Sequence, residues 1–99
     1  MHRQFKVLAI DDELENLKVL QAILSAEGFK PVVASDGTVG LRMAFELHPD
    51  AILLDVMMPD MDGFEVCKRL RELTDVPIIF VTGRGTIEDV VREIGRAHV

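Results

Sequence analysis

Three aspartates stand where apolar segments end, and together they could bind a cation and act on a phosphoryl group. Asp11 and Asp12 follow the apolar run 5–10, and Asp55 ends the apolar run 51–55. Carboxylates held about 4 Å apart repel one another by roughly 4 kcal/mol per pair at an effective dielectric near 20. Such a cluster must be protonated, solvated or neutralised by a cation. Oxygen ligands with room for water suit Mg²⁺, and beside such an ion Asp55 could serve as the nucleophile that accepts a phosphoryl group.

Four short apolar segments are predicted to be the strands that position these aspartates. They are residues 5–10, 29–34, 51–55 and 78–82. Nearly continuous apolar runs of this length are typical of parallel strands covered on both faces, so the last segment is expected to be buried like the third. Pro31 removes a donor from the second segment, which predicts that this strand lies at an edge of the sheet.

The segments between the strands show helical periodicity. Residues 14–24 carry an apolar stripe at helical spacing, and Gly28 follows where a residue with positive φ would end the helix. Residues 38–47 and 63–73 predict a second and a third helix, and 86–95 a fourth. The apolar stripe of the first helix is expected to contain Leu14, Leu17, Leu20 or Gln21, and Leu24. The second helix is expected to turn Leu41, Ala44 and Phe45 inward, and the third to carry Phe64, Cys67, Leu70 and Leu73 on or near one face.

Strands that alternate with helices predict one α/β domain over residues 1–99, with a parallel sheet and helices on both faces. Open sheets of this kind bind ligands outside the carboxyl ends of their strands. Asp11, Asp12, Asp55 and Thr82 each lie at or just after such an end, so we expect them to converge at one rim.

Composition limits the partners of the chain. The net charge of -6 opposes direct binding of nucleic acid, and no apolar run approaches the roughly 20 residues of a membrane span. Cys67 has no second cysteine with which to form a disulfide. A cytoplasmic location is therefore expected.

The chain resembles the receiver domain of bacterial two-component response regulators. The resemblance rests on the acidic pair Asp11 and Asp12, on Asp55 followed by Pro59 and Gly63, and on Thr82-Gly83 after the fourth strand; it covers about residues 6–95. It implies a flavodoxin-like sheet in the order 2-1-3-4, in which the strand with Pro31 is at an edge.

The resemblance also implies a role for each site residue. Asp55 would accept a phosphoryl group from a histidine kinase, and the Mg²⁺ ligands would be Asp11, Asp12, Asp55 and the backbone carbonyl of Met57. Thr82 would be the switch hydroxyl, and Gly83 would leave room for the phosphoryl group. Met57 and Arg84 would modulate the lifetime of the phosphorylated state. The implied module is not an enzyme beyond self-catalysed transfer and dephosphorylation.

The sequence departs from the family after the fourth helix. The family continues with a fifth strand, which starts near a lysine that binds the phosphoryl group, and a fifth helix; these are missing before Val99. Loss of a charge-assisted hydrogen bond of about 1.5 to 3 kcal/mol would weaken the phosphorylated state. The fourth strand would be an uncovered apolar edge, so a homodimer is expected, through pairing of that edge or exchange of the tail after Gly83.

Two other functions remain open from the sequence. A receiver-like interaction module that is not phosphorylated could work through its dimer surface. A phosphohydrolase that forms an aspartyl phosphate is a second alternative, but such enzymes commonly have an Asp two residues after the nucleophile, where this chain has Met57.

Overall fold

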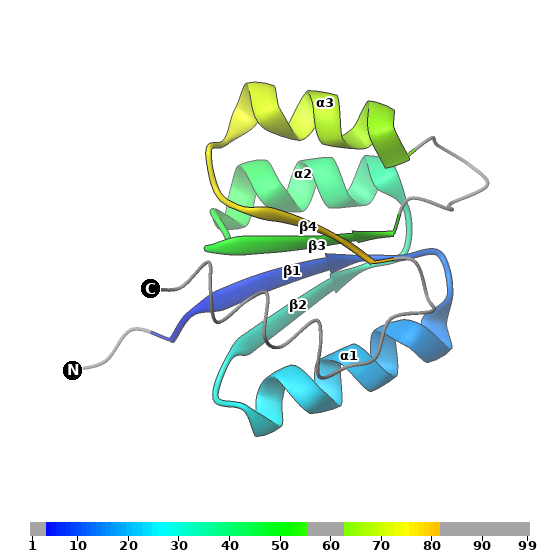
Figure 1. Cartoon of the computed structure of the whole chain (residues 1–99), viewed down its shortest axis with the longest axis vertical. Coiled ribbons are helices and arrows are strands. Elements are labelled where there is room, and N and C mark those ends of the chain that lie inside the picture. The colour runs from blue at the N-terminus through cyan, green and yellow to red at the C-terminus, as the bar shows by residue number, and fades with distance from the viewer. Residues whose placement is uncertain (1–3, 56–62, 82–99) are drawn as a thin grey trace.

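The computed structural model describes residues 4–55 and 63–81 of the chain. Strands and helices alternate along these residues, as the sequence predicts (Figure 1). In chain order they are β1 (Lys6–Ile10), α1 (Leu14–Ala26), β2 (Lys30–Ala34), α2 (Gly37–Leu47), β3 (Ala51–Asp55), α3 (Gly63–Leu73) and β4 (Ile78–Val81). The helix expected at 86–95 lies outside the described residues.

The sheet is parallel and has the order β2-β1-β3-β4. Both the order and the edge position of β2 are therefore confirmed. Pro31 lies opposite Val7 of β1, on a strand that has one neighbour in the sheet. An edge strand tolerates a residue without an N–H because its outer side does not need that donor.

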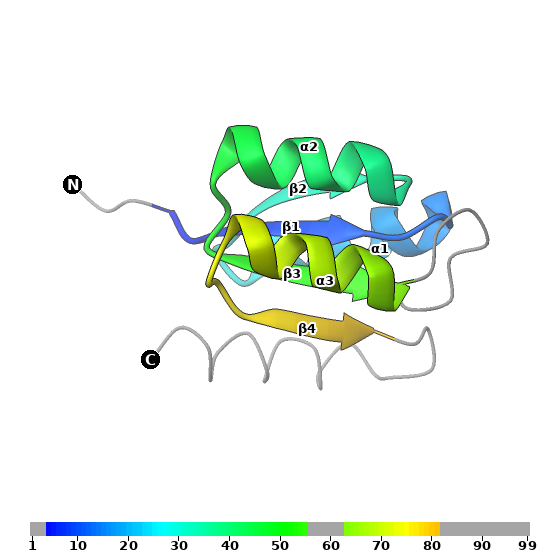
Figure 2. The ribbon, with the colours of Figure 1, turned by 90° about the horizontal axis from the view of Figure 1, so that it is seen from above.

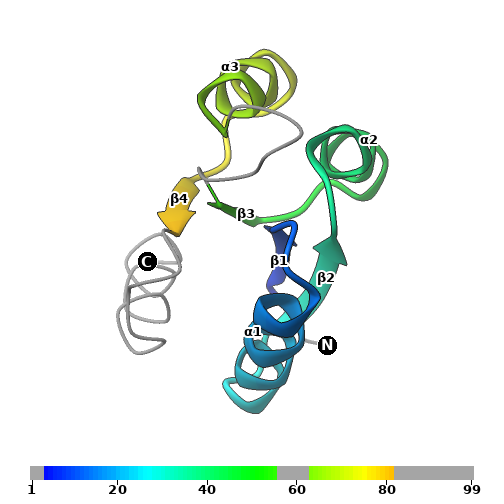
Figure 3. The same cartoon turned by 90° about the vertical axis from the view of Figure 1, so that its right-hand side faces the viewer.

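Helices cover both faces of the sheet, with α1 on one face and α2 and α3 on the other (Figure 3). Alternate residues of the central strand β1 point to opposite faces, as a pleated strand requires. Leu8 and Ile10 belong to the core beneath α2 and α3, while Val7 and Ala9 belong to the core beneath α1. Figure 2, seen from the side of α2 and α3, shows these two helices lying over the sheet. The two central strands are thus buried on both sides, which explains their continuous apolar sequences.

Local signals fix where the helices begin and end. Asp36 caps α2, because its side chain accepts a hydrogen bond from the N–H of Val39 at 2.8 Å. Gly28 follows α1 with φ of 91°, a conformation that a residue without Cβ adopts freely, so its predicted role is confirmed. None of the helices in these described segments is long and apolar enough to span a membrane.

The predicted inward faces of the helices were partly wrong. Leu17, Leu20, Leu24, Ala44 and Leu70 are buried as expected. Leu14, Phe45, Phe64 and Leu73 are instead exposed. Phe45 and Phe64 lie at the flanks of their apolar stripes, while Leu14 and Leu73 are the terminal residues of α1 and α3. Val66, with no exposed surface, takes the inward position in α3.

β4 is only partly covered. The expectation that it is buried like β3 was wrong, since Phe80 is 44% exposed and Ile78, Ile79 and Val81 are half-buried. Among the described strands, β4 borders β3 alone. This agrees with the second prediction from the sequence, that the fourth strand is an apolar edge.

Candidate functional site

The three aspartates converge at the carboxyl ends of β1 and β3. These strands are neighbours and run parallel, so the residues at their ends meet at one rim of the sheet. Asp11, Asp12 and Asp55 each offer a carboxylate oxygen, and these oxygens all lie within 4.8 Å of one another. Asp11 and Asp55 are buried, at 2% and 7% exposure, while Asp12 is half-buried. The predicted acidic cluster is therefore present among the described residues.

Asp11 is held by hydrogen bonds from the backbone and from one side chain. Its own N–H donates to the carbonyl of Ala34 in β2 at 3.1 Å, which continues the pairing of β1 beyond the end of the strand. Its Oδ1 accepts from the N–H of Glu13 at 2.9 Å, and its Oδ2 accepts from the amide of Asn16 at 3.2 Å. The carboxylate is thus oriented by the loop and the first turn of α1.

Burial raises the pKa of Asp11 from its ordinary value of 3.8 to about 6. The hydrogen bond from the Glu13 N–H opposes this rise, whereas the charge of Asp55 adds to it. The Asn16 amide also favours the ionised form, and a hydrogen bond shared with Asp55 favours the protonated form. Two buried carboxylates this close together are costly to ionise at the same time, because their negative charges repel and little water screens them. A bound cation would offset this repulsion.

The donor set fits a hard divalent cation. Carboxylate oxygens from three residues, one of them half-exposed, leave space for water, which Mg²⁺ retains when it binds to proteins. Sulfur and imidazole ligands, which would favour zinc or copper, are absent from this group of residues. The cluster therefore matches the chemistry of magnesium better than that of zinc or copper.

Four predicted site residues lie outside the described part of the chain: Met57, Thr82, Gly83 and Arg84. Their proposed roles stay predictions. The strand that leads to Thr82 is described, and its last residue, Val81, lies opposite Asp55 in the register of β3 and β4.

The hydrogen bond from Asn16 to Asp11 was not predicted from the sequence. Asn16 is half-buried in the first turn of α1, five residues after Asp11. Side chains in an α-helix tilt toward its N-terminus, so a residue in the first turn can reach back to an aspartate at the end of the preceding strand. A polar residue beside the buried Leu17 was the signal that could have indicated this contact.

Residues 7–98 match the model of the response regulator receiver domain. The chain is 44% identical over 84 residues to the "Probable transcriptional regulator ycf27" of Guillardia theta, an alignment that covers 85% of this chain and 33% of that protein. It is 41% identical over 86 residues to the "DNA-binding response regulator MtrA" of Mycobacterium tuberculosis, covering 87% of this chain and 38% of the relative. The chain thus spans about a third of the length of these relatives.

Solved structures share the fold. The chemotaxis protein CheY4 of Vibrio cholerae superposes with a TM-score of 0.84 at 24% identity, over 96% of this chain and 99% of that one. The N-terminal domain of a response regulator receiver protein from Methanoculleus marisnigri gives a TM-score of 0.78 at 28% identity, over 96% and 80% of the two chains. Because the family model matches residues 7–98, nearly the whole chain, the chain belongs to the receiver-domain family of response regulators.

Proposed function

We propose that this chain is a phosphoacceptor module, in which Asp55 takes a phosphoryl group from a histidine kinase in the presence of Mg²⁺. The observation that carries the proposal is the convergence of Asp11, Asp12 and Asp55 within 4.8 Å at the end of a fully buried strand. Of the three aspartates, Asp55 is positioned by β3, one of the two central strands of the sheet. A rigid strand end holds a nucleophile in a fixed place better than a loop would.

The metal ligands follow from the same cluster. Asp11 and Asp12 on one side and Asp55 on the other would hold Mg²⁺, together with the backbone carbonyl of Met57. When bound, the ion offsets the charge of the carboxylates and of the incoming phosphoryl oxygens. Thr82 and Gly83 would contact the phosphoryl group, and Met57 and Arg84 would modulate its lifetime.

The proposed transfer is a simple displacement at phosphorus. An ionised oxygen of Asp55 attacks the phosphorus of a phosphohistidine, the new P–O bond forms and the P–N bond breaks. The imidazole of the kinase leaves with the electron pair and takes up a proton. The product on this chain is a mixed anhydride, which water later hydrolyses, so the module stores a signal rather than turning over a substrate.

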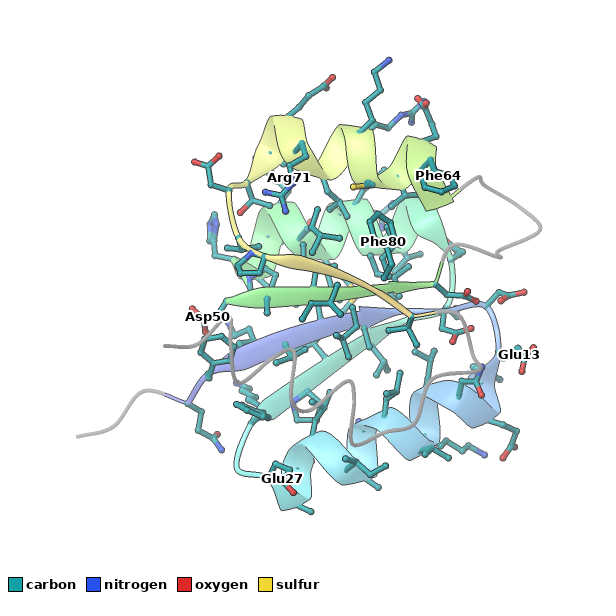
Figure 4. All side chains as sticks on the ribbon, in the orientation of Figure 1. Glu13, Glu27, Asp50, Phe64, Arg71 and Phe80 are labelled. Carbon is teal, nitrogen blue, oxygen red and sulfur yellow. The ribbon has the colours of Figure 1, made fainter. Side chains whose placement is uncertain are left out.

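The proposal is tested by intact-mass measurement after incubation with a small phosphodonor such as acetyl phosphate. Wild type with Mg²⁺ is expected to gain the mass of one phosphoryl group, and Asp55→Ala or removal of Mg²⁺ by a chelator is expected to abolish the gain. Asp50→Ala is a matched control, because Asp50 lies at the opposite end of β3 (Figure 4). An equal gain in Asp55→Ala would refute the assignment. No gain in wild type would favour the interaction module without phosphorylation.

A second copy of the chain is the partner that the β4 edge favours. β4 consists of Ile78, Ile79, Phe80 and Val81, without a charged residue or proline, whereas the opposite edge strand contains Lys30 and Pro31. Charged residues and prolines are the usual protection of an edge strand against pairing. Phe80 also lies beside the exposed Phe64 of α3, with ring centroids 5.9 Å apart, which extends the apolar surface (Figure 4). The proposed dimer joins two β4 strands antiparallel across a two-fold axis.

Light scattering on the eluate of a sizing column tests this dimer over a range of protein concentrations. Wild type and Phe45→Lys are expected to dimerise, because Phe45 is an exposed phenylalanine on α2, away from the β4 edge. Phe80→Lys is expected to be monomeric. A monomeric wild type at the highest concentration would refute the dimer. The net charge of -6 argues against direct contact with nucleic acid. We also propose a cytoplasmic location, because that is where histidine kinases present their phosphoryl group.

A further inference from the structure

We infer that Asn16 is a positioning residue of the site, which holds the carboxylate of Asp11 in the orientation that binds Mg²⁺. The inference rests on the metal site of the proposed function and adds a residue to it. Asn16 Nδ2 donates to Asp11 Oδ2 at 3.2 Å.

When Asp11 is ionised, as a metal ligand must be, each of its two oxygens has one donor, because the hydrogen bond shared with Asp55 needs a proton on one of the two carboxyl groups. Oδ1 accepts from the N–H of Glu13 and Oδ2 from the amide of Asn16. A carboxylate has about four lone-pair sites in all, so one direction on each oxygen is left for an ion or for its water. Because the donors approach different oxygens, they fix the rotation of the carboxylate about its Cβ–Cγ bond. The Glu13 N–H alone would leave this rotation free.

The donor itself is held rigidly. Asn16 lies in the first turn of α1, and the next residue, Leu17, is 3% exposed in the core between α1 and the sheet. Leu20 and Leu24 continue this contact along the helix. Asn16 therefore stands at a fixed place relative to the end of β1. A donor fixed by packing orients a ligand before the ion arrives, so less freedom is lost on binding.

Asn16 is unlike the other polar residues on α1. Glu15 and Lys18 are exposed and contact one another at 3.8 Å, and Gln21 is exposed. Asn16 is half-buried and points its amide at the one buried carboxylate that β1 provides. Among the described residues, Asn16 and Asp55 are the side chains that hydrogen-bond to Asp11.

Calorimetric titration of the full chain with Mg²⁺ tests the inference. Asn16→Ala is expected to raise the Kd for Mg²⁺ about tenfold, the lower end of the range typical of residues that orient metal ligands. Asn16→Leu keeps the volume without the donor and is expected to behave alike, while Asn16→Gln keeps an amide and is expected to recover part of the affinity. Gln21→Ala on the same helix is the matched control and is expected to leave the Kd unchanged. Urea denaturation of each variant separates lost affinity from lost stability.

The outcomes separate this inference from the proposed function. If Asp11→Asn weakens Mg²⁺ binding while Asn16→Ala and Asn16→Leu match wild type, the role of Asn16 is overturned and the metal site stands. If Asp11→Asn and Asp55→Asn both leave the titration unchanged, the metal site itself is overturned. A weaker Kd in both Asn16 variants, at unchanged stability and with Gln21→Ala as wild type, supports the inference.

Discussion

The carboxyl groups of Asp11 and Asp55 come from adjacent strands and approach within 4.8 Å in a place that water hardly reaches. Neither lies on a flexible segment, since Asp55 is the last residue of β3 and the N–H of Asp11 still pairs with Ala34 of β2. The sheet thus forces two like charges together. This arrangement raises the energy of the metal-free protein and prepares it to bind a cation.

The first prediction concerns pH. The folded protein holds a proton on Asp11 up to about pH 6, whereas the unfolded chain releases it near 3.8. Between these values the native state binds more protons, so the free energy of unfolding of the metal-free protein falls as pH rises. The contribution of Asp11 is fully present below the lower value and is lost above about 6. A shift of this size corresponds to at most about 3 kcal/mol.

Urea denaturation at several pH values in a chelator checks this prediction. The control is Asp11→Asn, which cannot titrate and is expected to show a smaller fall over the same window. Saturating Mg²⁺ is expected to remove the fall in wild type, because bound cation keeps Asp11 ionised. A wild type whose stability rises with pH across this window, in parallel with Asp11→Asn, would contradict the raised pKa.

Gly40 supplies a second prediction, about the packing of α2 on the sheet. A Cβ at this position would lie 2.5 Å from Cδ1 and 2.8 Å from Cγ1 of Ile10, which is 1% exposed. Gly40→Ala is therefore expected to destabilise the fold by about 1 to 2 kcal/mol, even though alanine favours the helix by about 1 kcal/mol. Urea denaturation gives the value.

Ile10→Val removes the nearest of the clashing atoms. In that background Gly40→Ala is expected to cost at least about 0.5 kcal/mol less than in wild type, a coupling that a double-mutant cycle detects. Equal costs in the two backgrounds would mean that Ile10 is not the obstacle.

The cap of α2 gives a third prediction. The side chain of Asp36 accepts from the N–H of Val39 at 2.8 Å, so Asp36→Ala leaves that donor without its partner. The expected loss is about 1 kcal/mol in the free energy of unfolding. Asp36→Ser retains an acceptor of similar reach and is expected to lose much less. Equal losses in the two variants would show that the cap does not stabilise the helix.

Much of the fold was predictable because strong local signals agreed with one another. The apolar run 51–55 was too short for a helix and too apolar for a surface strand, and β3 is buried along its whole length. Pro31 predicted an edge strand, and β2 is at an edge. The convergence of Asp11, Asp12 and Asp55 followed from one rule, that parallel strands end at the same rim.

The burial of individual helix residues could not be predicted as well, because it depends on which side of each helix packs against the sheet. Phe45 and Phe64 share apolar stripes with buried residues, yet they are 65% and 67% exposed. A stripe defines a helical face only to within about one residue on either side, and neighbouring elements decide which flank is covered. The contact of Asn16 with Asp11 was missed for a related reason, since it depends on how the first turn of α1 is rotated against the end of β1.

The most direct test of the account is to locate the phosphoryl group. Wild type is treated with a small phosphodonor and Mg²⁺ and then reduced with borohydride, which converts an aspartyl phosphate to homoserine, and its peptides are sequenced by tandem mass spectrometry. The account predicts homoserine at position 55 alone, and none when the donor or Mg²⁺ is omitted. Homoserine at position 11 or 12, or at no position in a protein that still binds Mg²⁺, would contradict the assignment of Asp55 as the phosphoacceptor.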